Sequence, residues 1–101
     1  MDRKVVWLEA ALDDLDQIAA YIAGDSPRYA SVVVGKMLAF AAELGRTGEM
    51  GRMVPEWGQE NVRERIAYSY RLIYRLDEKR VVILGVIHGA RLLPKGVRNR
   101  D

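Results

Sequence analysis

The chain has 101 residues, of which 30% are charged and 50% are hydrophobic, the composition of an ordinary globular domain. This length predicts a single domain, residues 1–101, whose core needs no metal or disulfide to hold it together. The sequence has no cysteine and one histidine, which excludes disulfides and thiolate metal sites. No apolar run reaches the roughly 20 residues that span a bilayer. We therefore expect a cytoplasmic protein without membrane contact, metal or cofactor.

The formal net charge of +2 is unevenly distributed along the chain. Residues 1–62 carry six Lys and Arg against ten Asp and Glu, a sum of −4. Residues 63–101 carry ten against four, a sum of +6. This asymmetry favours an anionic partner for the C-terminal half, either nucleic acid or an acidic protein segment. Segregated surface charge without a partner would give the same pattern.

The N-terminal third begins with the β-prone run Lys4 to Leu8, which predicts a first strand. From Glu9 to Ala23 the apolar residues recur at steps of three and four, as expected for an amphipathic helix. Gly24 suits the end of this helix.

A second helix is predicted directly after a short turn. Ser26 suits an N-cap and Pro27 suits the first helical position. The apolar pattern continues to about Leu44, and Gly45 suits the C-cap. Two helices joined by so short a turn predict a helical hairpin whose apolar stripe covers the strands that follow.

The C-terminal half changes to a β pattern. Residues 46–59 are rich in glycine and predict a loop, and residues 62–68 and 70–76 predict two strands. Residues 80–88 form a nearly continuous apolar run, as expected for a strand at the centre of a sheet. Residues 92–101 predict a mobile basic tail.

The predicted order β-α-α-β-β-β is accompanied by five characteristic stretches. They are WLEAALDDLDQIAAYI at 7–22, DSP at 25–27, GRMVPE at 51–56, YRLIY at 70–74 and VIHGAR at 86–91. Together they resemble the RelE/ParE superfamily, the toxins of type II toxin–antitoxin modules. The resemblance implies an α+β fold in which a helical hairpin packs on a twisted, mainly antiparallel sheet. It also implies a growth inhibitor that is neutralised by a cognate antitoxin, ParD-like or similar. The toxin would contact DNA only indirectly, through this antitoxin.

The superfamily has branches with different targets. ParE-like members act on DNA gyrase, often in plasmid stabilisation, whereas RelE-like members cut messenger RNA on the ribosome. The opening VVWLEAALDDLDQI and the segment VIHGARLLP are similar to ParE-type chains, so a gyrase inhibitor without enzymatic activity is expected first. The alternatives are a metal-free messenger RNA endonuclease and a partner-binding domain without toxicity.

The nuclease alternative assigns three residues by motif. In a subgroup resembling YoeB, Glu56 would be the base, Arg71 the phosphate clamp and His88 the acid, which supplies what metal-free RNA cleavage requires. The match has a gap, because Gly89 and Ala90 stand where the nucleases typically carry an aromatic residue.

Each of these three residues also has a structural interpretation. Glu56 could cap a turn or pair with Arg52, and Arg71 could be a buried arginine paired with a carboxylate. His88 could anchor the last strand, with Gly89 permitting a sharp exit.

Five residues are predicted to face a partner. Arg63, Arg65 and Arg75 would point outward from their strands and offer a basic surface to an acidic antitoxin segment. Arg91 would lie at the end of the last strand. Trp57 would contribute to an apolar groove for an antitoxin helix, or would fold back onto the sheet instead.

Overall fold

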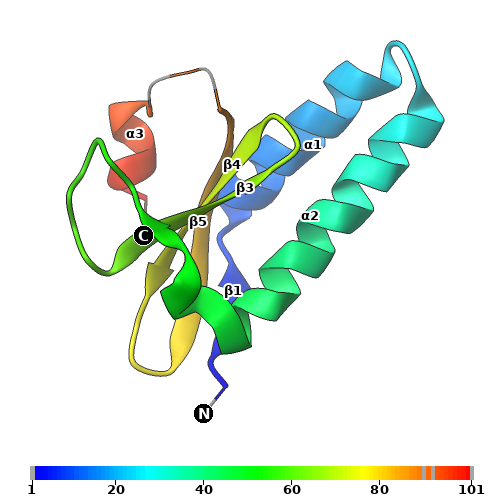
Figure 1. Ribbon diagram of the computed structural model, residues 1–101. Coiled ribbons are helices and arrows are strands. Elements are labelled where there is room, and N and C mark those ends of the chain that lie inside the picture. The colour runs from blue at the N-terminus through cyan, green and yellow to red at the C-terminus, as the bar shows by residue number, and fades with distance from the viewer. Residues whose placement is uncertain (1, 90, 92, 101) are drawn as a thin grey trace.

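The computed structural model describes residues 2–89, 91 and 93–100 and consists of a sheet with helices on both faces (Figure 1). The strands are β1 Lys4–Trp7, β2 Arg52–Met53, β3 Val62–Ala67, β4 Tyr70–Leu76 and β5 Arg80–His88. The helices are α1 Glu9–Ala23, α2 Pro27–Thr47, the 3₁₀ helix η1 Gly48–Met50 and α3 Lys95–Arg98. The sheet order is β1-β5-β4-β3-β2, with β1 parallel to β5 and the other pairs antiparallel. This confirms the predicted α+β fold.

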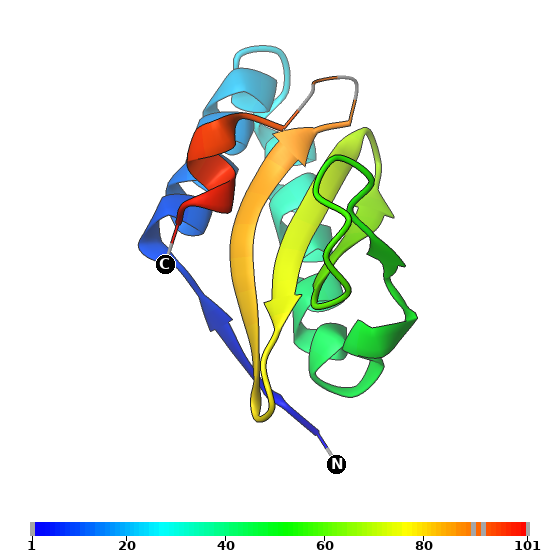
Figure 2. The same ribbon diagram turned by 90° about the vertical axis from the view of Figure 1, so that its left-hand side faces the viewer.

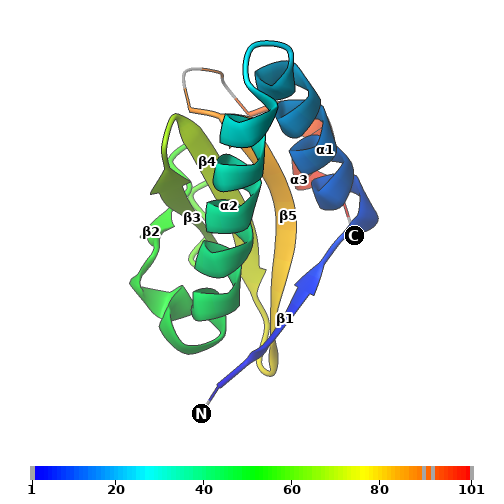
Figure 3. The same cartoon turned by 90° about the vertical axis from the view of Figure 1, so that its right-hand side faces the viewer.

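The hairpin of α1 and α2 covers one face of the sheet (Figure 3). The turn between them is fixed as predicted, because the Ser26 Oγ accepts a hydrogen bond of 3.1 Å from the N–H of Tyr29 and Pro27 opens α2. The apolar stripe of the hairpin buries Leu15, Val33 and Met37 against Leu72 and other side chains of the strands. Along the described residues, no helix is long and apolar enough to cross a membrane.

The predicted end of the second helix was wrong. Helix α2 continues past Gly45 to Thr47, and Gly48 is its C-cap. Gly45 is buried where the N-terminal segment crosses the helix, and the N–H of Arg3 donates to its carbonyl at 2.7 Å. A Cβ at Gly45 would lie 2.6 Å from the Arg3 carbonyl oxygen, so this glycine permits a close approach and does not terminate the helix.

Helix α3 and the loop 54–61 lie over the opposite face of the sheet (Figure 2). A second, smaller core lies on this face. The segment predicted as a loop, residues 46–59, also contains the end of α2, η1 and the short strand β2. The predicted tail contains α3, and Val97 is buried in the second core. Its mobility stays a prediction, and residues 92 and 101 lie outside the described part of the chain.

Candidate functional site

Arg71 is the centre of a charged network on the sheet face that looks away from the hairpin. Its two terminal nitrogens donate to the two carboxylate oxygens of Glu56, both at 2.7 Å, and its Nε donates to Glu64 Oε1 at 2.7 Å. Residue Arg71 is only 5% exposed. Paired, planar donors of this kind hold a carboxylate in a fixed geometry.

The network extends from Arg71 in both directions. Glu64, in β3, is 1% exposed and also accepts a hydrogen bond from Arg52 Nε. On the other side, the carboxylate of Glu56 accepts a hydrogen bond of 3.4 Å from the N–H of Leu93. The charges alternate from Arg52 through Glu64 and Arg71 to Glu56, so each buried ion faces at least one of opposite sign. The network thereby connects β2, β3 and β4 to the C-terminal segment.

The same contacts set the protonation of Glu56 and Arg71. The hydrogen bonds from Arg71 lower the pKa of Glu56 from its ordinary value of 4.5 to about 2, outweighing the opposite effect of burial. The hydrogen bond with Glu56 raises the pKa of Arg71 further above its ordinary value. At neutral pH Glu56 is therefore a weakly basic carboxylate, and the guanidinium directs its donors at carboxylates of the chain itself.

His88 does not join Glu56 and Arg71. In the pairing of β4 with β5, Arg71 stands opposite Ile87 and Tyr70 stands opposite His88. Successive side chains of a strand point to opposite faces, so His88 lies on the hairpin side of the sheet and Arg71 on the other. There the imidazole packs edge-to-face on Tyr70, with ring centroids 5.6 Å apart. Gly89 follows with its N–H bonded to the Ser69 carbonyl at 2.7 Å.

The three arginines predicted to form one basic surface lie on two faces. Arg63 and Arg65 stand opposite Tyr74 and Leu72 on the hairpin side, whereas Arg75 stands opposite Val62 on the other side. Each contacts the chain itself, in ways that differ. Arg63 donates to the carbonyls of Glu60, Glu49 and Gly51; Arg65 pairs with Glu43 at 2.8 Å and lies 4.3 Å over the Phe40 ring; Arg75 pairs with Asp77 at 2.8 Å.

The two other residues predicted to face a partner differ in exposure. Trp57 is half-buried and packs against the second core, so the alternative in which it folds back onto the sheet describes its position. Arg91 is exposed, and its main chain is held by the carbonyl of His88 at 3.0 Å.

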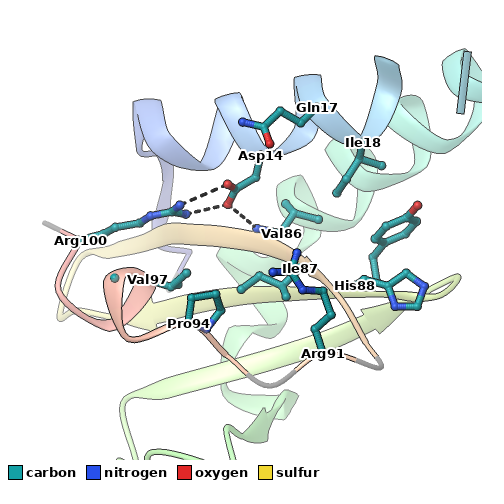
Figure 4. A pocket seen from close by; sticks show the side chains of 12 residues that line it. Asp14, Gln17, Ile18, Val86, Ile87, His88, Arg91, Pro94, Val97 and Arg100 are labelled. Carbon is teal, nitrogen blue, oxygen red and sulfur yellow. Dashed lines mark hydrogen bonds and ion pairs between the residues drawn. The ribbon is translucent and has the colours of Figure 1, made fainter. Parts of the chain in front are cut away.

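A cleft of about 340 Å³ lies between α1, α3 and the end of β5 (Figure 4). Strand β1 covers β5 only from Arg80 to Ile83, so the outer edge of β5 is open beyond that point. Asp14 reaches from α1 to accept from the N–H of Val86 at 3.1 Å and from Arg100 at 2.6 Å. Arg100 in turn donates to the carbonyl of Leu84 at 2.9 Å. This ion pair therefore bonds two main-chain groups of the open edge, the carbonyl of Leu84 and the N–H of Val86.

A larger cleft of about 630 Å³ adjoins it at the far end of the hairpin. We call it the tyrosine cleft, because four of the five tyrosines of the chain line it, with Ile18, Ile22 and Val33 as further apolar groups. These rings belong to Tyr21 of α1, Tyr29 of α2, Tyr70 of β4 and Tyr68 in the β3–β4 turn. His88 and Arg91 line both clefts.

Sequence reasoning missed the Asp14–Arg100 pair and the tyrosine cleft. Residues 86 positions apart give no local signal for an ion pair. The sequence puts Tyr68 at the end of the predicted strand 62–68 and Tyr70 at the start of the next, where packing is the common role of tyrosine. In the described part of the chain, no group of three or more His, Cys, Asp or Glu side chains could hold a metal ion.

Comparison with known proteins places this architecture in a family. The model of the ParE toxin of the type II toxin–antitoxin system parDE matches residues 5–93. None of the curated proteins matches the sequence.

Three solved structures have the same fold. The chromosomal ParDE system from P. aeruginosa is similar with a TM-score of 0.69 and 21% identity, covering 85% of this chain and 95% of that one. The RelBE2 toxin–antitoxin complex from Mycobacterium tuberculosis has a TM-score of 0.64 and 26% identity, and the match covers 87% of this chain and 99% of that one. A mutant of the E. coli toxin RelE in the free state has a TM-score of 0.63 and 19% identity, and the match covers 89% of this chain and 86% of that one. From its sequence match and its fold, the chain belongs to the ParE toxin family of type II toxin–antitoxin systems.

Proposed function

We propose that this type II toxin acts in the ParE manner, by inhibiting DNA gyrase in the cytoplasm, and is neutralised by a cognate antitoxin. The match of the ParE toxin model to residues 5–93 supports this branch over the nuclease branch. The solved ParDE and RelBE2 structures are toxin–antitoxin assemblies, which supports an antitoxin as the partner of this chain as well.

The observation that carries the proposal is that Glu56, Arg71 and His88 are not arranged for RNA cleavage. A general base works best with a pKa near the working pH, and the pKa of Glu56 is about 2. The donors of Arg71 that would clamp a phosphate contact Glu56 and Glu64. The acid, His88, lies on the other face of the sheet. We therefore infer a structural role for this network, which connects the strands to the C-terminal segment.

The antitoxin contacts follow from which cations remain accessible. Arg63, Arg65 and Arg75 contact carbonyls or carboxylates of the chain itself, so we assign them to the stability of the toxin. Arg91 is exposed at the rim of two clefts, and we assign to it a direct contact with an acidic group of the antitoxin.

The proposal is tested by two assays with the same purified chain. One measures supercoiling by DNA gyrase, and the other maps new 5′ ends in ribosome-bound messenger RNA. We expect inhibited supercoiling with intact RNA, and addition of the antitoxin should restore gyrase activity. New RNA ends that disappear on Arg71→Lys, a change that keeps the charge but loses the bidentate geometry, would support the nuclease alternative instead. A chain without effect in either assay, and without growth arrest on expression, would be a partner-binding domain.

A further inference from the structure

The tyrosine cleft exposes three of its four rings, those of Tyr21, Tyr29 and Tyr68, whereas Tyr70 packs against the first core. Tyr21 is 82% exposed, Tyr29 is 49% exposed and Tyr68 is 44% exposed, although all three line one cleft. The fifth tyrosine, Tyr74, is fully buried, so tyrosine in this chain is not confined to the surface. Clustered exposed rings with polar tips are typical of protein interfaces.

The backbone at Tyr68 is strained. Ala67 pairs with Tyr70, so Tyr68 and Ser69 form a two-residue hairpin turn, and Tyr68 has a φ of 55°. Among the described residues, it is the single non-glycine residue with a positive φ, a conformation in which glycine is the default. The turn holds the Tyr68 ring edge-to-face against Tyr29, with centroids 6.4 Å apart. A two-residue hairpin turn itself calls for a positive φ, so the turn fixes the position of the half-exposed Tyr68 ring at the cleft.

The charge on the rim restricts what can bind. The described residues that line the cleft include Arg91 and His88 but no Asp or Glu. Within the described part of the chain, the Arg91 guanidinium makes no ion pair. One exposed arginine suits one carboxylate, whereas a nucleic-acid strand requires several cations along its phosphates. The cleft therefore favours a protein segment.

We propose that the tyrosine cleft binds a segment of the antitoxin that inserts one aromatic or large aliphatic side chain among the four rings. A carboxylate next to that side chain pairs with Arg91. Apolar insertion supplies affinity, and the charged contact at the rim fixes orientation and salt dependence. This inference rests on the proposed function, because it takes the antitoxin to be the partner.

The test measures the affinity of the cognate antitoxin for variants of the full chain by calorimetry. Tyr21→Ala and Tyr68→Gly should each weaken binding at least tenfold, and Arg91→Gln should weaken it and reduce its salt dependence. Glycine suits the positive φ at residue 68, and Tyr21 is mostly exposed, so both variants should fold. Two controls lie outside the cleft, Leu38→Ala for an exposed apolar side chain and Arg28→Gln for the charge change, and each should stay within twofold of the wild type.

Each outcome bears on a different part of the reasoning. If the antitoxin binds the wild type but the cleft variants bind within twofold of it, the assignment of the cleft is wrong and the proposed function stands. If the antitoxin does not bind the wild type, the proposed function itself fails. A short single-stranded RNA serves as the second probe. Tyrosine-dependent RNA binding, with antitoxin affinity unchanged in the same variants, would assign the cleft to nucleic acid and overturn the inference.

Discussion

Replacement of Arg71 by methionine tests whether the charged network stabilises the fold. Methionine keeps most of the aliphatic stem of arginine and removes the guanidinium, so packing changes less than in a change to alanine. The substitution leaves Glu64, which is almost completely buried, with Arg52 as its remaining ion-pair partner. Glu56 loses both of its bonds to the guanidinium.

The cost follows mainly from the burial of Glu64 and of the guanidinium that it loses. Breaking a buried ion pair by removing one partner costs about 3–5 kcal/mol. The lower end applies here, because Glu64 keeps Arg52 and the side chain of Glu56 is 25% exposed and can turn toward water. We expect Arg71→Met to lower the free energy of unfolding by about 3 kcal/mol, or the melting temperature by about 12–24 °C for a domain of this size. Adding Glu64→Leu removes the buried carboxylate that has lost Arg71, and should recover about 1 kcal/mol or more of the free energy of unfolding.

Urea unfolding at pH 7 measures both values, with Arg80→Met as the matched control. The Arg80 side chain is 49% exposed and pairs with Asp77 at 3.1 Å, so its loss should cost less than about 1 kcal/mol. If Arg71→Met and Arg80→Met destabilise the chain equally, within about 0.5 kcal/mol, burial of the network contributes nothing and the structural role fails. If the double variant is less stable than Arg71→Met alone, the Glu64 carboxylate does not destabilise the fold of the single variant.

Three further predictions concern other contacts. The pKa of Glu56 is about 2 in the folded chain and ordinarily 4.5, so its contribution to stability is complete above pH 4.5 and is lost as the pH falls toward 2. Glu56→Gln should therefore reduce the change of the urea unfolding midpoint with pH between these two values. An unchanged pH dependence of the midpoint would contradict the assignment. Gly45→Ala should cost about 1–3 kcal/mol in thermal unfolding because its Cβ meets a carbonyl, whereas Gly35→Ala in the same helix meets no atom within 4 Å and should gain about 0.5–1 kcal/mol. Tyr74→Phe removes the 2.6 Å bond to the carbonyl of Gly48 and should cost about 1–2 kcal/mol, which equal urea midpoints for wild type and variant would disprove.

The parts of the fold that sequence predicted well are those with a local cause. The bounds of α1, β4 and β5 coincide with the prediction, because apolar periodicity and the flanking turn residues are read within a few positions. The start of α2 was also correct, since the cap at Ser26 involves a residue three positions away.

The errors have long-range causes. Gly45 has the sequence context of a helix end, and only the crossing of Arg3, far away in the chain, shows why glycine is required there. Residues 63, 65 and 75 were grouped because all three are arginines in strands, but alternation and register send them to different faces. Of the predicted catalytic residues, Glu56 and Arg71 do meet, whereas His88 lies on the other face of the sheet because of the register of β5.

The open edge of β5 shows how the tertiary structure completes what local sequence leaves unfinished. Leu84 and Val86 flank Gly85, and in a parallel sheet their carbonyl and N–H would bind one residue of the next strand. Here Arg100 donates to the first and Asp14 accepts from the second, so the ion pair takes the place of that residue. A Cβ at Gly85 would lie 2.8 Å from Arg100 Nη1 and 3.0 Å from Asp14 Oδ2, which explains a glycine in an otherwise apolar strand. Unpaired strand edges invite association with other chains. Through Arg100, the C-terminal segment covers part of this edge and so protects it from such association.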